Sequence, residues 1–403
     1  MCAWRLCNPC SNTIYPFICE SWPNRKRSAS ENDTQFRWEA NFEEQMTTPD
    51  RIRSTWPLVG AVGALLCSML FGSALFPQNG QAGPYDLGRP SKPKLFAEGV
   101  ISTEDDELNG AFSPDGTEYY FTKVNQYTTF PRLGLLCVSR YRDHRWTEPE
   151  VLPFSGKYLD FPPRLAPDGK TLYFASSRPV EGKNLHALKI WSVPRRADEW
   201  GEPVLLPPPI NALDDRWNWA PSVTQDGTLY FASTRDGSGH AHVYRSRLVN
   251  NAYTEPEKLG AEINSDFNDA DPYVSPDERL LVFASAGGEL PEGADRPETV
   301  KGGGVRYPRG DLYASFGQNG HWNKAQHLEN DVNSFADESS PSISPDGKYL
   351  FFSSERSPFS VPTARRLNYQ QIERILHSVL NGHGNIYYIT LDALEIERRS
   401  KPQ

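Results

Sequence analysis

A short turn-and-strand segment occurs five times in this chain of 403 residues. In its fullest copy, SPDGKYLFFSSER at 344–356, Pro345, Asp346 and Gly347 supply the backbone angles of a tight turn, and an aromatic strand follows. The other copies are SPDGTEYYFT (113–122), APDGKTLYFAS (166–176), TQDGTLYFAS (224–233) and SPDERLLVFAS (275–285). A repeated unit of this kind cannot bury its own apolar face, so the copies must stack on one another.

The spacing of the copies predicts the architecture. The turn aspartates Asp115, Asp168, Asp226, Asp277 and Asp346 are separated by 53, 58, 51 and 69 residues. Each interval holds four short strand patterns, the last of which follows an aromatic residue, as in Trp146-Thr-Glu-Pro. Four strands in a repeat of this size are typical of a blade of a β-propeller. We therefore expect an all-β fold, a five-bladed β-propeller.

The two ends of the repeat region predict how the ring closes. No fourth strand follows the last repeat, whereas a strand pattern at Lys94–Ile101 precedes the first. We expect this N-terminal strand to complete the last blade, which leaves no exposed sheet edge. Apolar residues recur with helical period in Tyr369–Leu380, and Gly382 and Gly384 follow. This pattern predicts one inserted helix that caps one face.

Taken together, SPDGTEYYFT, APDGKTLYFASSR, SPDERLLVFAS and SPDGKYLFFSSER resemble the PD40 (WD40-like) repeats of the TolB-type β-propeller family. The resemblance covers about residues 94–396. It implies a propeller and, because TolB has six blades, it leaves a six-bladed TolB-like ring as the alternative to five. TolB works in the periplasm through protein partners, but propellers host many unrelated activities, so the resemblance implies a fold more than a function.

The chain divides into four parts at the sequence level. We expect residues 1–55 to be disordered or a wrongly assigned start, with Met46 as the alternative start, 56–82 to be a signal peptide or membrane anchor, 83–92 a linker and 93–398 the PD40-repeat propeller.

The apolar segment predicts export. The run Pro57–Phe76 contains no charged side chain, and Arg51 and Arg53 precede it. This layout is typical of a cleaved secretory signal, and the run is also long enough to span a bilayer as a retained transmembrane tether. In either case the positive flank predicts that the propeller lies in the periplasm or outside the cell.

Charge and cysteine usage narrow the possible partners. The net charge of −9 argues against nucleic-acid binding, which needs a basic face. Only Cys137 lies in the repeat region, so the propeller must be stabilised by its core and not by disulfides. We also expect the protein to be a monomer.

Aligning the five copies on the turn aspartate reveals a polar position eight residues upstream. It is occupied by Glu107, Asp160, Asn218, Asp269 and Glu338, and Asp271 lies nearby. There the outer strand of one blade leads into the inner strand of the next, at one mouth of the central channel. We predict that these residues bind a ligand, with a cation such as calcium as one candidate and no other cofactor. Alternatively, each group accepts hydrogen bonds within its own blade.

Arg178, Arg235 and Arg356 end the second strand in three repeats. They are secondary candidates, because a guanidinium can hold an anionic ligand through two hydrogen bonds. The alternative is that they tie one blade to the next.

Signatures of common enzymes are absent from the sequence. There is no G-x-S-x-G, HExxH, P-loop or dinucleotide fingerprint, and we assign no catalytic residue. We therefore expect an exported cell-envelope module that binds a protein or a glycan at the acidic channel mouth. The alternative is a glycoside hydrolase or lyase that uses the channel carboxylates.

Overall fold

The computed structural model describes residues 84, 86–125, 133–182, 187–197, 199–212, 214–286, 299–300, 304–305, 310–318, 320–334, 336–358 and 366–394. The predictions for residues 1–55 and 56–82, including the signal or anchor at Pro57–Phe76, lie outside these residues. No helix within the described ranges is long and apolar enough to cross a membrane.

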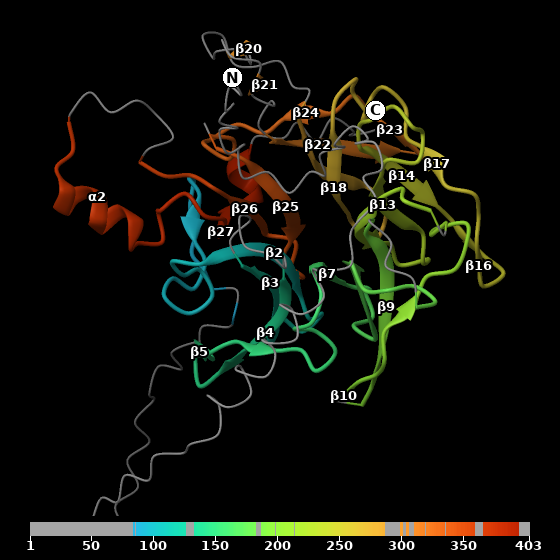
Figure 1. Ribbon diagram of the computed structural model, residues 1–403, viewed down its shortest axis with the longest axis horizontal. Helices are drawn as coiled ribbons and strands as arrows, with labels where there is room; N and C mark the ends of the chain where they lie inside the picture. The colour runs from blue at the N-terminus through green and yellow to red at the C-terminus, as the bar shows by residue number, and fades with distance from the viewer. Residues whose placement is uncertain are drawn as a thin grey trace, which may run out of the picture. The chain divides into compact units, whose positions relative to one another are not determined.

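Five antiparallel sheets follow one another along the chain, and each sheet is one blade (Figure 1). The inner strands of blades 1 to 5 are β2 (Asp106–Phe112), β7 (Asp160–Leu165), β12 (Asn218–Val223), β18 (Asp269–Val274) and β25 (Glu338–Ile343). The second strands are β3 (Glu118–Val124), β8 (Thr171–Ser176), β13 (Leu229–Ser233), β19 (Leu280–Ser285) and β26 (Tyr349–Ser354). The third strands are β4 (Gly134–Arg142), β9 (Lys189–Arg196), β14 (His242–Ser246), β22 (Asp311–Gln318) and β27 (Asn385–Thr390).

The outer strands are only two residues long, which limits the exposed edge of each blade. They are β6 (Glu150–Val151), β11 (Val204–Leu205), β17 (Glu257–Lys258), β24 (Gln326–His327) and, for blade 5, β1 (Lys94–Leu95). The third strands of blades 1, 2 and 4 also pair with β5 (Arg145–Trp146), β10 (Glu199–Trp200) and β23 (His321–Trp322). Two small hairpins stand apart from the blades, β15 (Leu248–Val249) with β16 (Ala252–Tyr253), and β20 (Thr299–Val300) with β21 (Gly304–Val305).

The N-terminal strand closes the ring, as the sequence predicts. In β1, Lys94 lies opposite Tyr388 and Leu95 opposite Tyr387 of β27, and the Phe96 N–H donates to the Ile386 carbonyl at 2.8 Å. The inner strand β2 contacts both β7 and β25, so the first blade meets the last. The five-bladed prediction is therefore confirmed, and the six-bladed alternative is wrong.

Apolar side chains fill each junction between successive blades. Between blades 5 and 1, for example, Phe96 packs against Phe112, Tyr119, Phe351 and Tyr388 with ring centroids 5.0–6.3 Å apart. Comparable clusters lie between blades 1 and 2, 2 and 3, 3 and 4, and 4 and 5. Each sheet thus buries both of its faces against its neighbours.

The repeated turns form as expected. In four copies the turn glycine has a positive φ, such as 69° at Gly347. The turn aspartate accepts a hydrogen bond from the hydroxyl two residues before it, such as Ser344 Oγ at 2.7 Å, in every copy except the second, where Ala166 has no hydroxyl. The fourth copy has Glu278 where the others have glycine, and Glu278 adopts the same left-handed conformation at φ 54°.

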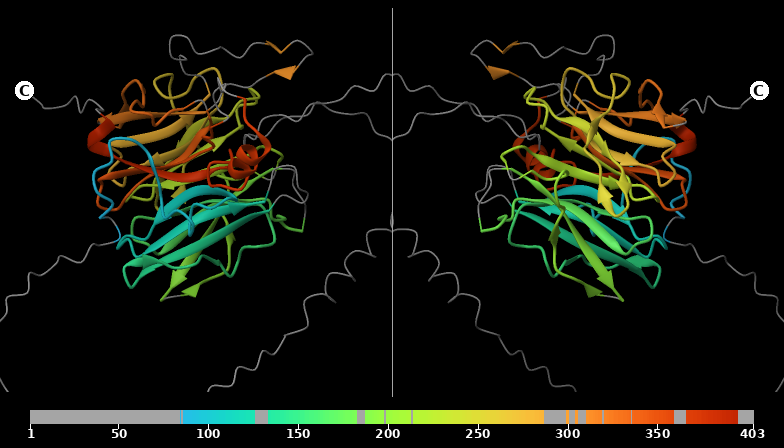
Figure 2. Two further views of the ribbon diagram at one scale, coloured as in Figure 1. Left: turned by 90° about the vertical axis from the view of Figure 1, so that its left-hand side faces the viewer. Right: turned by 90° about the vertical axis from the view of Figure 1, so that its right-hand side faces the viewer.

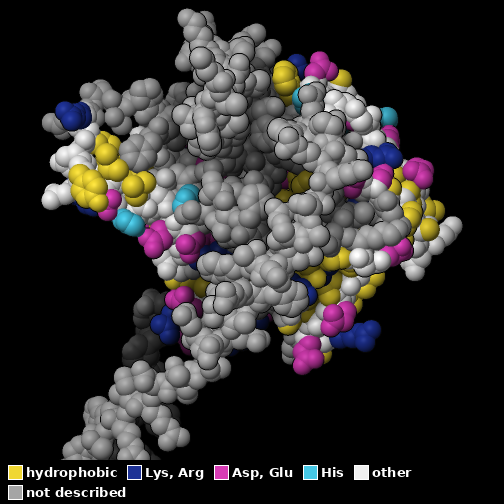
Figure 3. Space-filling model, in the orientation of Figure 1, with side chains coloured by type: hydrophobic (Ala, Val, Ile, Leu, Met, Phe, Trp, Pro, Cys, Tyr) yellow, Lys and Arg dark blue, Asp and Glu magenta, His cyan; other side chains and the backbone are white. Residues whose placement is uncertain are grey.

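The inserted helix is α2 (Tyr369–Leu376), and a short 3₁₀ helix, η1 (Leu391–Leu394), follows β27. Asn368 caps α2 through a reciprocal hydrogen-bond pair with Gln371. The helix has no buried residue, so the expectation that it caps one face of the propeller is wrong. It lies beside the sheets in Figures 1 and 2, and its exposed apolar side chains form a patch in Figure 3.

Truncating Phe96 to alanine is expected to destabilise the fold strongly, because Phe96 is 1% exposed and its ring joins blade 5 to blade 1. We expect a loss of about 3–5 kcal/mol in the free energy of unfolding, measured by urea denaturation. Phe267→Ala is the matched control, since Phe267 is 46% exposed. Equal stability of the two variants would contradict closure through this strand.

Candidate functional site

An irregularity in every inner strand sets which residues face the channel axis. The pairing with the second strand shifts between Leu108 and Ala111, Phe161 and Arg164, Trp219 and Ser222, Ala270 and Tyr273, and Ser339 and Ser342. Such bulges bend a strand and re-aim the side chains that follow. At three of them a non-glycine residue, Ala220, Asp271 or Ser340, has φ of 47–52°.

The five predicted residues at the start of the inner strands are all buried. Their side chains do not form an open acidic rim, because each is at most 2% exposed. We call them the strand-start residues: Glu107, Asp160, Asn218, Asp269 and Glu338.

Every strand-start residue is hydrogen-bonded within its own blade or the connection that leads to it. Glu338 accepts from the Ser334 N–H and hydroxyl at 2.9 and 2.6 Å and from Ser354 Oγ at 2.6 Å. Asp269 has the same arrangement with Ser265 and Ser285. Asp160 and Asn218 accept from Ser176 and Ser233, and Glu107 accepts from Thr103. This geometry matches the alternative that the sequence left open. Ligand binding by these side chains stays a prediction.

Burial shifts the strand-start carboxyls toward their neutral forms. Desolvation raises the pKa of Glu338 to about 7, against the lowering effect of Arg356 and the serine hydrogen bonds. It also raises the pKa of Glu107, Asp160 and Asp269. Ion pairs with Lys123, Arg178 and Arg356 also offset the charges of Glu107, Asp160 and Glu338.

The three repeated arginines contact the connection from the preceding blade. Arg178, Arg235 and Arg356 donate to the carbonyls of Phe154, Ile210 and Val332, and each also donates to the serine that ends the second strand. Arg356 also lies 4.7 Å from the centroid of the Tyr387 ring. These contacts are those of a tie between blades. A role in holding an anionic ligand stays a prediction.

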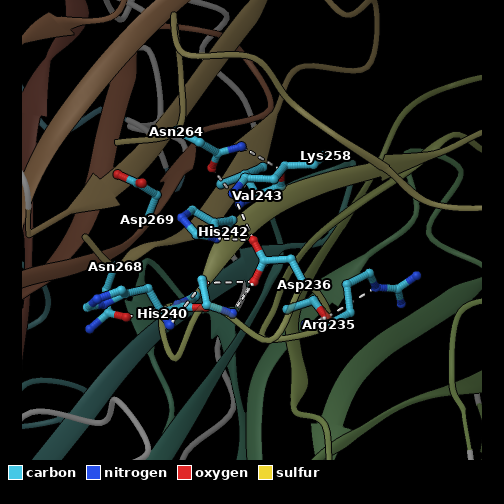
Figure 4. Close-up of polar contacts among 12 residues, drawn as sticks. Arg235, Asp236, His240, His242, Val243, Lys258, Asn264, Asn268 and Asp269 are labelled. Atoms are coloured by element: carbon cyan, nitrogen blue, oxygen red, sulfur yellow. Dashed lines mark hydrogen bonds and ion pairs between the residues drawn. The ribbon is translucent and has the colours of Figure 1, made fainter. Parts of the chain in front are cut away.

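Figure 4 shows the polar contacts around the connection between blades 3 and 4. Asp236 Oδ2 lies 2.9 Å from His242 Nδ1 and 2.8 Å from Lys258 Nζ. Asn264 accepts from the Val243 N–H at 2.7 Å and donates to the Val243 carbonyl at 3.0 Å. Asn211 and Asn333 make the same pair of bonds in their junctions, to Ile190 and Leu312. The repeated asparagine therefore fastens the connection to the third strand.

Hydrogen bonds between blades cross the middle of the channel. The Arg164 guanidinium of blade 2 donates to the Gly110 carbonyl of blade 1 and, at 2.8 Å, to the Pro341 carbonyl of blade 5. Asp271, which the sequence placed among the ligand residues, is 7% exposed and accepts from the Ser340 N–H at 3.1 Å. Burial raises the pKa of Asp271, while Ser340 and the charge of Arg164 oppose this shift.

A hollow of about 1260 Å³ lies at the end of the channel where the repeated turns are, opposite the strand-start residues. All five blades line it. We call it the turn-end hollow. The first residue after each bulge lines it too, and these five equivalent positions form an axial ring: Ala111, Arg164, Ser222, Tyr273 and Ser342.

The sequence reasoning missed this site. The axial ring lies four residues upstream of the turn aspartates, a position that holds four different residue types in the five copies. Divergence between the copies would not have singled it out, because the positions six and seven residues upstream differ in every copy.

The described residues contain no cluster of three or more histidine, cysteine or acidic side chains placed to hold a metal ion. A cation such as calcium at the channel mouth stays a prediction.

Comparisons with known proteins give structural neighbours only. No family model matches the chain, and no curated protein matches it. Among solved structures, it is similar to TolB from Acinetobacter baumannii at 19% identity and a TM-score of 0.38, over 62% of this chain and 51% of that one.

The chain is also similar to a phage phi92 endosialidase, at 12% identity and a TM-score of 0.40, over 69% of this chain and 54% of that one. A third structure, a putative glucose dehydrogenase from Thermus thermophilus, has 15% identity and a TM-score of 0.38, over 74% of this chain and 99% of that one. The chain spans about half the length of TolB and of the endosialidase. These values are too low to transfer a function.

Replacing Glu338 with glutamine is expected to change how stability depends on pH. The folded pKa of about 7 lies above the ordinary 4.5, so the folded state keeps its proton longer than the unfolded state. The wild type should therefore lose about 3 kcal/mol relative to Glu338→Gln as the pH rises from 4.5 to 7. Urea denaturation across this range measures it, with exposed Glu199→Gln as the control. Parallel pH profiles for wild type and Glu338→Gln would contradict the buried, neutral carboxyl.

Proposed function

We propose that this chain is a TolB-like propeller of the PD40-repeat type that acts as a binding or scaffold module for a protein partner in the cell envelope. The observation that carries the proposal is the turn-end hollow, to which all five blades contribute side chains. A hollow on the axis of a ring lets one partner contact every blade at once. Concave sites with a few polar groups among apolar walls are where proteins usually bind ligands.

The proline residues at the edge of the hollow suit a peptide. Pro114, Pro276 and Pro345 are exposed and Pro167 is half-buried where the turns meet the hollow. Proline is rigid and lacks an N–H, so these turns offer a preformed apolar edge with few hydrogen-bond donors. A peptide can pack its apolar side chains on this edge while its polar groups face the polar side chains that also line the hollow.

Export rests on the sequence pattern at Pro57–Phe76, and both a cleaved signal and a membrane tether are compatible with the proposal.

The alternative of a glycoside hydrolase or lyase gains no support from the strand-start residues, because their carboxyls are buried and hydrogen-bonded within the blades.

Filling the turn-end hollow should remove partner binding without unfolding the protein. Ala111 is half-buried in the axial ring, so Ala111→Trp places an indole in the hollow. Val249→Trp is the matched control, because Val249 is 50% exposed on the separate hairpin β15–β16.

The wild type and both variants are used to capture proteins from an envelope extract, and the captured partner is purified and titrated by calorimetry. We expect at least a tenfold weaker Kd for Ala111→Trp and an unchanged Kd for Val249→Trp, with melting temperatures within a few degrees. Equal affinity of the Ala111→Trp variant, or capture of a glycan in place of a protein, would overturn the proposal.

A further inference from the structure

The axial ring presents a different side chain in most blades. The next residue along each inner strand is apolar in every blade: Phe112, Leu165, Val223, Val274 and Ile343. The ring itself holds alanine, arginine, serine, tyrosine and serine at equivalent positions. The five blades thus offer four different residue types to the hollow, and such a lining suits an asymmetric ligand.

Arg164 is the charged member of the ring. Its side chain is 4% exposed and lines the turn-end hollow, and burial lowers its pKa only to about 10, so it is a cation at neutral pH. Its terminal nitrogens donate to two backbone carbonyls, whereas its Nε has no hydrogen-bond partner among the described residues. A buried donor without a partner is costly, and a ligand oxygen would remove that cost.

Arg164 has no ion pair within 4 Å in the described part of the chain. Against the effect of burial, the charge of the nearby Asp271 raises the pKa of Arg164, and Asp271 itself accepts hydrogen bonds from Ser340. Arg164 therefore places a cation at the base of the hollow, whose lining also includes Asp277, Glu278 and Arg279.

Hydroxyl groups surround this charge in the ring. Ser222 Oγ accepts from the Val274 N–H at 2.9 Å and Ser342 Oγ accepts from Asn109 Nδ2 at 2.9 Å, which leaves both hydroxyl protons to donate. Tyr273 is half-buried, lines the hollow, and makes no hydrogen bond through its hydroxyl to any described residue. A guanidinium N–H together with hydroxyl donors suits an anionic oxygen group.

We infer that the axial ring is a carboxylate receptor, in which an acidic group of the peptide partner enters the turn-end hollow and accepts hydrogen bonds from Arg164 and Tyr273. The inference rests on the proposed function and names the chemistry that the partner must present. The carboxylate comes either from an aspartate or glutamate side chain or from a free C-terminus. Charge-assisted hydrogen bonds at a desolvated site favour the ionised group over its neutral amide.

The test titrates the full chain by calorimetry with three short glycine-rich probe peptides. One carries a central aspartate and blocked ends, the second has asparagine in its place, and the third is an all-glycine peptide with a free C-terminal carboxylate. We expect the asparagine peptide to bind at least tenfold more weakly than the tighter of the two acidic peptides. Tightest binding of the aspartate peptide identifies a side-chain carboxylate, and tightest binding of the all-glycine peptide identifies a terminus.

Two variants assign the effect to the ring. Tyr273→Phe removes one donor and keeps the ring in place, so it should weaken the acidic peptide severalfold and leave the asparagine peptide unchanged. Arg164→Gln should abolish the preference for the acidic peptide. Arg164 also donates hydrogen bonds to two other blades, so the melting temperature of the Arg164→Gln variant is measured in parallel. If Arg164→Gln unfolds, the Tyr273→Phe result alone decides.

Equal binding of the acidic and asparagine peptides, or no binding of either, would overturn the carboxylate receptor. An acid preference that survives in Tyr273→Phe undiminished would also overturn it. The proposed function is judged separately by the Ala111→Trp variant, since a protein partner can fill the hollow without presenting an acidic group.

Discussion

Burial of both faces of every sheet by its neighbours is the constraint on which this structure depends. A four-stranded sheet with aromatic residues on both sides cannot stand alone in water, and only a closed ring supplies a neighbour for each face. The ring of blades is closed by the two residues of β1, which pair with β27, and by Phe96, whose side chain packs against aromatic residues of blades 5 and 1. The outer strands can be very short because the faces of the sheets, and not their edges, carry the stability.

The polar residues of the repeat serve this packing. Each connection between blades leaves backbone groups that no strand can pair, and buried groups of this kind must find partners. The strand-start residues, the serines that end the second strands and the repeated asparagines supply them. Residues that recur in several blades are thus engaged in the framework, whereas the axial ring offers four different residue types to the hollow.

Much of the fold could be predicted from the sequence, because turn chemistry and strand alternation are local. The blades, the turns at Asp115 and Asp346, and the exchange of the N-terminal strand into the last blade all follow from spacing. The helix at Tyr369 was predicted from its period, but its lack of burial was not, since periodicity does not show what lies opposite an apolar face. Spacing also aligned the strand-start carboxyls, but it carries no information on their burial, which only the structure shows.

The sequence by itself determined that five equivalent units must assemble, because each repeat carries its own turn and its own unsatisfied apolar faces. Only the tertiary structure decided which side chains reach the axis. A bulge in each inner strand shifts the register by a residue, and such a shift reverses the face that a side chain occupies. Arg164 and Tyr273 therefore meet in one hollow although 109 residues separate them in the chain.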